Sequence, residues 1–93
     1  MTVLVQMSVK PPDTARFVAT AEKYAPRMAE MGAANGGVFE DENEPGLMTI
    51  VAEWASHDAM MAATDRFGEA FNAEAGTEGL EWVTHIWERR GDA

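Results

Sequence analysis

Residues 47–60, Leu-Met-Thr-Ile-Val-Ala-Glu-Trp-Ala-Ser-His-Asp-Ala-Met, decide the fold because they change from strand spacing to helix spacing within a few residues. Up to Trp54 the residues are largely apolar or β-branched and alternate in character, which is typical of a strand. After it, Ser56 is placed to cap a helix with its hydroxyl, and Asp58 puts negative charge near the positive end of the helix dipole. We therefore expect a strand that ends at Trp54, a helix that begins after Ser56, and a binding site at their junction.

The segment before this junction predicts one strand and one helix. Alternating residues over 3–10, followed by Pro11-Pro12, indicate a first strand. Asp13 is a suitable cap for a helix that ends at Gly32, where glycine supplies a left-handed stop. We expect this helix to kink or restart at Pro26, because proline removes a backbone hydrogen-bond donor.

Two further strands complete the pattern. The glycine-rich residues 33–40 predict an edge strand, and the acidic connection 40–46 ends in Pro-Gly, which suits a type II turn. This strand and the one ending at Trp54 should therefore form a hairpin. The connection lacks the ligand spacing of a calcium loop, so we interpret it as a solvated turn. The second helix should end near Gly76, and a last strand should span 80–88.

This order of elements predicts an α+β, ferredoxin-like βαββαβ fold, formed by residues 1–93 as a single domain. The strand order would be 4-1-3-2 in an antiparallel sheet with both helices on one face. Alternation divides the strand residues into an apolar set, which we assign to the helix face, and a mixed set on the bare face. The apolar set contains Val3, Val5, Met7, Val9, Met48, Ile50, Ala52, Trp54, Val83, His85 and Trp87.

The mixed set suggests a second subunit. It contains Leu4, Gln6, Ser8, Leu47, Thr49, Val51, Glu53, Trp82, Thr84 and Ile86. Such a face exposes more contiguous apolar surface than a monomer usually shows to water. We therefore expect a homodimer in which two sheets pack face to face through their open faces.

The motif Glu53-Trp54-x-Ser56-x-x-Ala59, the Asp-Glu-Asn-Glu-Pro-Gly hairpin and the order of elements resemble the dimeric α/β-barrel superfamily, specifically its antibiotic-biosynthesis-monooxygenase-like (ABM-like) members. The resemblance covers essentially the whole chain. It implies a pocket between sheet and helices in each subunit, with Trp54 at the strand end. The superfamily includes quinone-forming monooxygenases, haem-degrading enzymes, lactone isomerases and polyketide cyclases. Because residues 59–75 hold no His that matches the haem ligand of the haem-degrading members, we expect no haem and no other cofactor.

His85 is the candidate catalytic base, since it would be the one titratable group among apolar neighbours on the helix face. The alternative is a core His with one hydrogen-bond partner, and the sequence leaves both open. The expected substrate-binding residues are Trp54, Trp87, Met7, Tyr24 and Phe67. For these residues, too, ordinary core packing is the alternative. His57 is expected at the surface.

Composition excludes several classes of partner. A net charge of −9 with only seven Lys and Arg argues against nucleic acid and anionic membranes. No Cys is present, so the chain has no disulfide and no thiolate, and no spacing of His and carboxylates predicts a metal site. No apolar run approaches the ~20 residues that span a bilayer. Nothing at the start is typical of a signal peptide, so we expect a cytoplasmic protein.

Two functions follow from these expectations. The first is a small-molecule enzyme resembling the cofactor-independent monooxygenases, in which His85 removes a proton from an aromatic or polyketide-like substrate and the anion reacts with O₂. The alternative is a non-catalytic homodimeric module that binds a hydrophobic metabolite or a protein partner.

Overall fold

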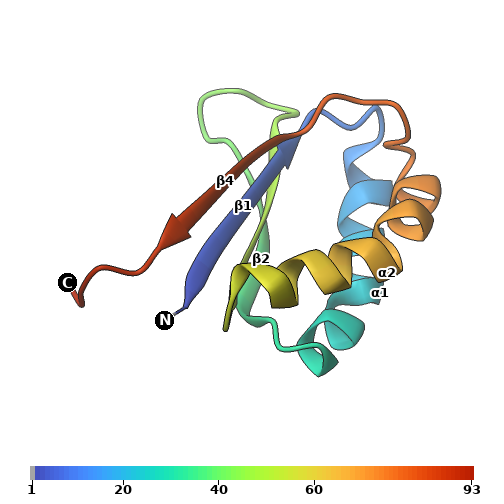
Figure 1. Cartoon of the computed structure of the whole chain (residues 1–93). Coiled ribbons are helices and arrows are strands. Elements are labelled where there is room, and N and C mark those ends of the chain that lie inside the picture. The colour runs from blue at the N-terminus through green and yellow to red at the C-terminus, as the bar shows by residue number, and fades with distance from the viewer. Residues whose placement is uncertain (1) are drawn as a thin grey trace.

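The structure, a computed structural model, describes residues 2–93. Its elements are β1 (Val3–Val9), α1 (Thr14–Glu30), β2 (Ala34–Glu40), β3 (Met48–Trp54), α2 (His57–Ala75) and β4 (Val83–Glu88). The strands form an antiparallel sheet of order β2-β3-β1-β4, and Figure 1 shows both helices against one of its faces. The predicted ferredoxin-like fold and its strand order are therefore confirmed.

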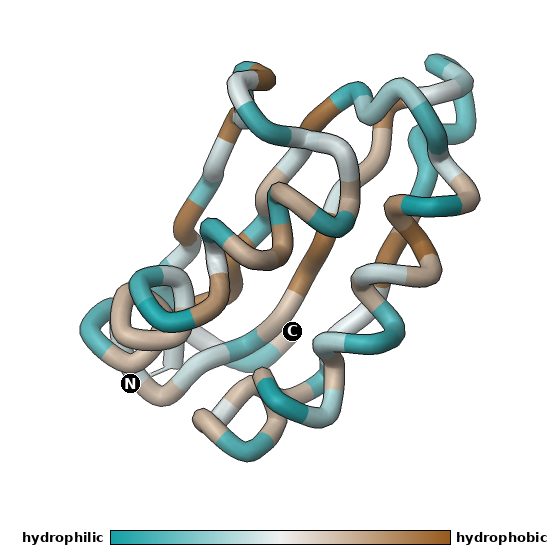
Figure 2. Tube along the Cα trace, turned by 90° about the vertical axis from the view of Figure 1, so that its right-hand side faces the viewer, coloured by the Kyte–Doolittle hydropathy of each residue, from teal (hydrophilic) through white to brown (hydrophobic). Residues whose placement is uncertain are grey.

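Both helices begin at the predicted caps. The Asp13 carboxylate accepts a hydrogen bond from the Arg16 N–H at 3.0 Å, and the Ser56 hydroxyl accepts one from the Ala59 N–H at 3.1 Å. Hydrophilic and hydrophobic residues alternate along the helix traces in Figure 2, as expected where one side of each helix is buried. Of the two outcomes predicted at Pro26, a kink or a restart, the restart does not occur, because α1 continues through this residue.

The acidic connection between β2 and β3 is a hairpin turn, as predicted. The Leu47 N–H donates to the Glu44 carbonyl at 3.1 Å, and Gly46 has φ of +92°, the conformation that a type II turn needs. The Asp41 carboxylate accepts from the Asn43 and Glu44 N–H groups at 2.7 and 2.9 Å. This acidic side chain therefore stabilises the turn itself.

The side chains of β4 lie on the faces of the sheet opposite to those predicted. In the β1–β4 pair, Leu4 lies opposite Trp87 and Gln6 lies opposite His85. Residues paired across antiparallel strands share a face, and Leu4 and Gln6 alternate with the buried Val3 and Val5 of the helix face. His85 and Trp87 therefore lie on the face that the helices leave bare.

The prediction for β4 fails because of Trp82, the residue directly before this strand. β4 begins at Val83 rather than at residue 80, and Trp82, predicted on the bare face, instead packs against Phe17 with ring centroids 6.0 Å apart. Thr84 and Ile86, also predicted there, lie on the helix face opposite Met7 and Val5 of β1. Both alternating sets of residues 80–88 contain a Trp and aliphatic side chains, so their hydropathy does not determine which set meets the helices.

The bare face, called the open face below, carries three large exposed apolar side chains. Phe39, Val83 and Trp87 are 57%, 54% and 54% exposed. Phe39 and Val83 lie in the same row across the sheet, and Trp87 lies in another row at the edge formed by β4. By register, the open face contains Leu4, Gln6, Ser8, Gly37, Phe39, Thr49, Val51, Glu53, Val83, His85 and Trp87.

Candidate active site

Trp54 is held in a cluster of apolar side chains at the junction of β3 and α2. It is 6% exposed and packs with Val3 and Val5 of β1 and with Met60 and Ala63 of α2. The Ser56 cap starts α2 directly after the strand, so the first two turns of this helix lie over the indole. The predicted position of Trp54 between sheet and helices is therefore correct.

A second cluster fills the other end of the same layer with aromatic rings. Tyr24 of α1 makes edge contacts with Phe67 and Phe71 of α2, with centroids 6.1 and 5.5 Å apart. Phe17 contacts Phe71 at 5.9 Å. The buried members of this cluster are Val9, Phe17, Ala21, Tyr24, Met48, Phe71 and Ala75.

The two clusters meet at four half-buried residues, called the seam below: Met7, Met28, Ile50 and Ala52. Met7 of β1 lies opposite Ile50 of β3, on the helix face of the two central strands. Met28 of α1 packs against both clusters. The seam is uncharged, and it is less completely covered than the cluster cores on either side.

The sequence did not identify Met28, Ile50 and Ala52 as site residues. Their alternation and helical spacing place them correctly on apolar faces, but such patterns do not distinguish a half-buried position from a buried one. Only the packing of the two helices leaves these side chains partly exposed.

The predicted site residues divide between the two faces of the sheet. Trp54, Met7, Tyr24 and Phe67 lie in the sheet–helix layer. His85 and Trp87 lie on the open face, where both are exposed and their rings meet edge-on at 5.9 Å. The prediction that His85 and Trp87 face the helices beside Trp54 is wrong, because the register with β1 turns them away. The sheet itself separates the imidazole from the seam.

Tyr24 and Glu74 form the titratable pair at the junction of the two helices. Glu74 Oε1 accepts from Lys23 Nζ at 2.6 Å, and the buried Oε2 lacks a donor with good hydrogen-bond geometry among the described residues. A hydrogen-bonding interaction with Glu74, together with burial, raises the pKa of Tyr24 above its usual 10.0. The hydrogen bond from Lys23, and then the polar interaction with the nearby Tyr24 hydroxyl, lower the pKa of Glu74 below 4.5, against the opposing effect of desolvation. At neutral pH, Tyr24 is therefore protonated and Glu74 is ionised.

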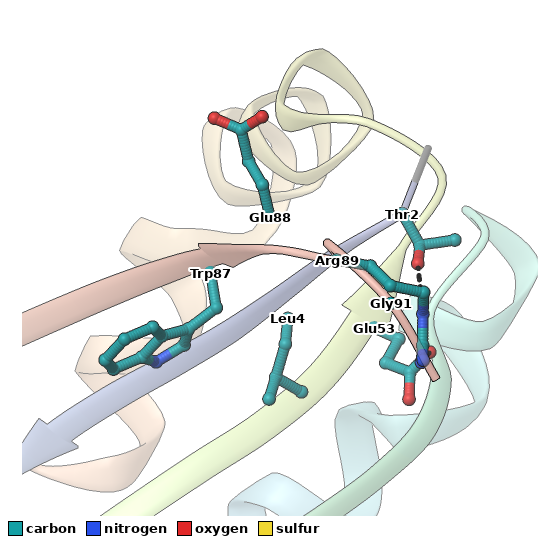
Figure 3. A pocket seen from close by; sticks show the side chains of 7 residues that line it. All are labelled: Thr2, Leu4, Glu53, Trp87, Glu88, Arg89 and Gly91. Atoms are coloured by element: carbon teal, nitrogen blue, oxygen red, sulfur yellow. Dashed lines mark hydrogen bonds and ion pairs between the residues drawn. The ribbon is translucent and has the colours of Figure 1, made fainter. Parts of the chain in front are cut away.

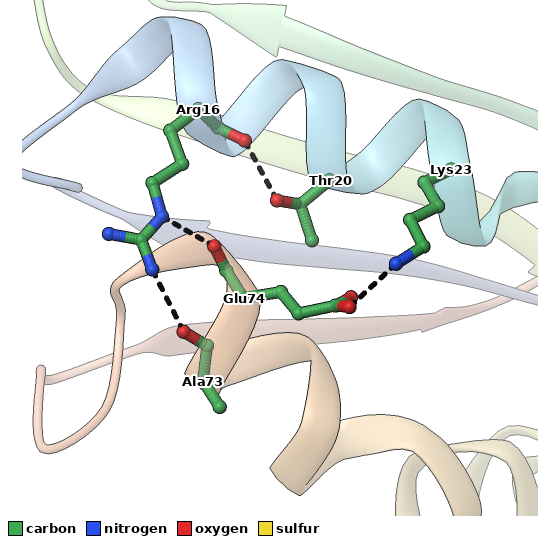
Figure 4. A network of polar contacts seen from close by, with 5 residues as sticks. All are labelled: Arg16, Thr20, Lys23, Ala73 and Glu74. Atoms are coloured by element: carbon green, nitrogen blue, oxygen red, sulfur yellow. Dashed lines mark hydrogen bonds and ion pairs between the residues drawn. The ribbon is translucent and has the colours of Figure 1, made fainter.

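This pair belongs to a larger network shown in Figure 4. Arg16 of α1 donates from Nε to the Glu74 carbonyl at 2.5 Å and from Nη2 to the Ala73 carbonyl at 3.0 Å. These are carbonyls of the last turn of α2, which has no basic residue of its own. A shallow hollow of about 430 Å³ is lined by Arg16, Ala19, Thr20, Lys23 and Glu74. The network ties α1 to α2 and lies outside the seam.

A smaller hollow of about 210 Å³ lies at one end of the open face. Figure 3 shows Trp87 and Leu4 pointing to the same side of their strands, with Glu88 on the opposite side. The Trp87 Nε1–H donates to Gln6 Oε1 at 2.9 Å, and Arg89 lies 3.5 Å from the Glu53 carboxylate. This hollow is on the face opposite to the seam, so it does not join Trp87 to Trp54.

Residues 2–93 contain neither a cluster of metal-binding side chains nor a membrane-spanning helix. In this range no three His, Asp or Glu side chains are placed to hold a metal ion together. Neither α1 nor α2 has the length and apolar character that crossing a membrane requires.

The family model described as antibiotic biosynthesis monooxygenase matches residues 1–71. The matched range runs from β1 through most of α2, so it includes Met7, Trp54 and Phe67. It ends before β4, the strand that carries His85 and Trp87. None of the curated proteins matches the chain.

Solved structures with the same fold come from several organisms. A conserved protein from Methanosarcina mazei Go1 has a TM-score of 0.80 at 16% identity and covers 97% of this chain and 94% of its own. SnoaB, a cofactor-independent oxygenase from Streptomyces nogalater, has a TM-score of 0.74 at 18% identity. The match covers 98% of this chain and 94% of SnoaB. Rv0793 from Mycobacterium tuberculosis has a TM-score of 0.77 at 16% identity. The match covers 100% of this chain and 99% of Rv0793. At these identities the likeness shows the fold alone.

Proposed function

Since the chain belongs to the antibiotic biosynthesis monooxygenase family, we propose that it oxygenates an aromatic or polyketide-like small molecule without a bound cofactor, and that the substrate ring binds at the seam beside Trp54. The observation that carries this proposal is the half-buried, uncharged seam between two well-packed clusters. The cofactor-independent oxygenase SnoaB, which has the same fold, supports the type of reaction.

The reaction depends more on orientation of the substrate and on an apolar environment than on catalytic side chains. A substrate with an acidic C–H beside a phenol ring loses a proton, and its anion reduces O₂ and combines with it to give a peroxide. Loss of water then leaves a carbonyl, so one oxygen atom enters the product and the other leaves as water. Trp54 and Phe67 supply aromatic surface for the ring, and the flexible Met7 and Met28 adapt to its outline. Exclusion of water from the seam would favour electron transfer from the anion.

The proton acceptor in this proposal is solvent. The seam contains no carboxylate or imidazole, and Tyr24 is held in its protonated form by its raised pKa. His85 is exposed on the other face of the sheet. The substrate must therefore be acidic enough to lose its proton to water before it enters the seam.

We also propose that the protein is a homodimer formed through the open face. Four strands spaced by about 4.8 Å, with about 3.3 Å per residue, make a face of about 19 Å by 23 Å. Its flat projection alone is about half of the ~800 Å² that each partner of a standard interface buries. The exposed Phe39, Val83 and Trp87 add apolar surface that a second copy would cover.

The test of catalysis is O₂ uptake with a phenolic anthrone, followed together with the absorbance of the quinone product. We expect Trp54→Phe to lower kcat/KM by about tenfold, which corresponds to ~1.4 kcal/mol of lost transition-state stabilisation. Trp82→Phe is the matched control, since Trp82 is a half-buried Trp that packs against Phe17 in the other cluster. Oxygen uptake no faster than in buffer, or equal losses in both variants, would contradict the proposal.

The second candidate is a non-catalytic homodimer that binds a hydrophobic metabolite or a protein partner. It is favoured by the separation of His85 from the seam, which leaves no base beside the ring. Saturable binding of an apolar aromatic, lost in a variant with a filled seam but accompanied by no O₂ uptake, would support it. A cytoplasmic location remains a prediction from the sequence.

A further inference from the structure

Methionines are concentrated around Trp54. The chain has seven, and four of them belong to or pack against the cluster that contains this indole. Met60 is a buried member of the cluster, and Met7, Met28 and Met31 pack against it from β1 and from the end of α1. Thioethers from three separate elements therefore converge on the cluster that contains Trp54.

These methionines differ in access to solvent. Met60 is 5% exposed, whereas Met7, Met28 and Met31 are each half-buried. Two other methionines serve as references: Met48 is 4% exposed in the other cluster, and Met61 is 40% exposed on α2. Met7 and Met28 belong to the seam, and Met31 packs against the same cluster, so a molecule bound at the seam would lie close to these three half-buried side chains.

We propose that Met7, Met28 and Met31 form a site that captures aromatic hydroperoxides and reduces them by thioether oxidation. This inference rests on the proposed function, because it assumes that an aromatic ring enters the seam. A thioether lone pair attacks the distal oxygen of the hydroperoxide, the O–O bond breaks, and the proton moves to the leaving alkoxide. The sulfur is oxidised to a sulfoxide, and the hydroperoxide is reduced to an alcohol, so no further reductant takes part.

Selectivity for an aromatic hydroperoxide follows from the surroundings. Sulfur atoms make favourable contacts with aromatic rings. The indole of Trp54 and the ring of Phe67 extend the apolar surface. Hydrogen peroxide gains nothing from such surface, because it must give up its hydrogen bonds to water there. An aromatic hydroperoxide therefore spends more time beside these sulfurs than its bulk concentration implies.

Oxidation at this site also weakens the fold. A sulfoxide at Met28 places a polar group where the two clusters meet. Burying a polar group without a hydrogen-bond partner is unfavourable, so the oxidised protein should unfold at a lower urea concentration. Modification of the exposed Met61 should leave the urea midpoint unchanged.

The test compares cumene hydroperoxide with hydrogen peroxide on the intact protein. The gain of one oxygen atom at each methionine is followed over time by peptide mass spectrometry, with Met61 as the internal reference. With hydrogen peroxide we expect Met61 to react first. With cumene hydroperoxide we expect oxidation of Met7, Met28 and Met31 relative to oxidation of Met61 to rise several-fold, while Met48 stays unmodified. An equal ratio with both reagents would overturn the proposal.

A variant that fills the seam supplies the second measurement. Ala52→Leu adds bulk at a half-buried position between the clusters. It should abolish the preference for cumene hydroperoxide without changing the rate at Met61, and a preserved preference in the folded variant would also overturn the proposal. The outcome is independent of turnover: a binding module would show the preference without O₂ uptake, and an enzyme that lacks the preference would retain its activity.

Discussion

The indole N–H of Trp87 donates a hydrogen bond to the Gln6 side-chain carbonyl at 2.9 Å, across the pair formed by β4 and β1. Gln6 alternates with the buried Val5, so this bond forms only if Trp87 lies on the open face. His85, two residues earlier, then lies on the same face. This one cross-strand hydrogen bond thus shows that His85 and Trp87 lie on the face of the sheet opposite to Trp54.

Because of the way β4 faces, a charge introduced at Val83 should affect dimerisation and a charge introduced at Ile86 should not. Val83→Glu places a carboxylate on the open face, where a second copy would bury it, and should weaken dimerisation by tenfold or more, about 1.4 kcal/mol. Ile86→Glu changes the same strand on the helix face and should leave the dimer intact. Light scattering across a concentration series measures both. A wild-type monomer at micromolar concentration, or equal effects of the two variants, would contradict the dimer proposal.

His85 provides the test that distinguishes the two faces. Because the sheet separates His85 from the seam, His85→Phe should leave kcat/KM for the anthrone unchanged and should preserve the dimer. Steady-state kinetics at several pH values, with light scattering on the same samples, measure both quantities. Loss of turnover in a folded dimer would restore His85 as the catalytic base and would place the substrate on the open face.

Glu74 should make stability depend on pH in acid. Its pKa is lowered in the folded protein by Lys23 and then Tyr24, so its contribution is fully present above the unfolded value near 4.5 and is lost as pH falls through the folded value. Glu74→Gln should therefore reduce the difference in urea midpoint between pH 6 and pH 3. The exposed Glu78→Gln is the control. An unchanged pH profile in Glu74→Gln would show that the ion pair adds no stability.

Tyr24 should have the opposite dependence at high pH. Its pKa is raised by Glu74 and by burial, so the folded state favours the neutral phenol. The stability that it contributes is present below pH 10 and is lost as pH rises through the folded value. A spectrophotometric titration should show Tyr24, the single tyrosine of the chain, ionising above pH 10 in the folded protein and at lower pH in urea.

Arg16 should stabilise α2 from outside that helix. Its guanidinium donates to the Ala73 and Glu74 carbonyls, which are near the negative end of the helix dipole. Arg16→Gln should lower the free energy of unfolding by about 1 kcal/mol. Urea denaturation measures the loss, and Arg90→Gln near the exposed C-terminus should have no effect. Equal stability of Arg16→Gln and wild type would mean that water replaces the guanidinium without loss.

Local sequence determined the elements of this fold. The Asp13 and Ser56 caps, the Pro45-Gly46 turn and the change of spacing at Trp54 each act within a few residues, so the order of strands and helices follows from the sequence alone. The facing of β1 and β3 was equally clear, because in each strand one alternating set is the more apolar.

The tertiary structure alone decided the facing of β4 and the place of the seam. Residues 80–88 satisfy either facing by hydropathy, and the choice depends on contacts distant in sequence, those of Trp82 with Phe17 and of Trp87 with Gln6. Half-burial of Met7 likewise depends on how two helices pack over the sheet, which no single segment specifies. A shift of one residue moves every side chain of a strand to the opposite face, and in residues 80–88 either alternating set could meet the helices. Only non-local packing could therefore place His85 on the face opposite Trp54.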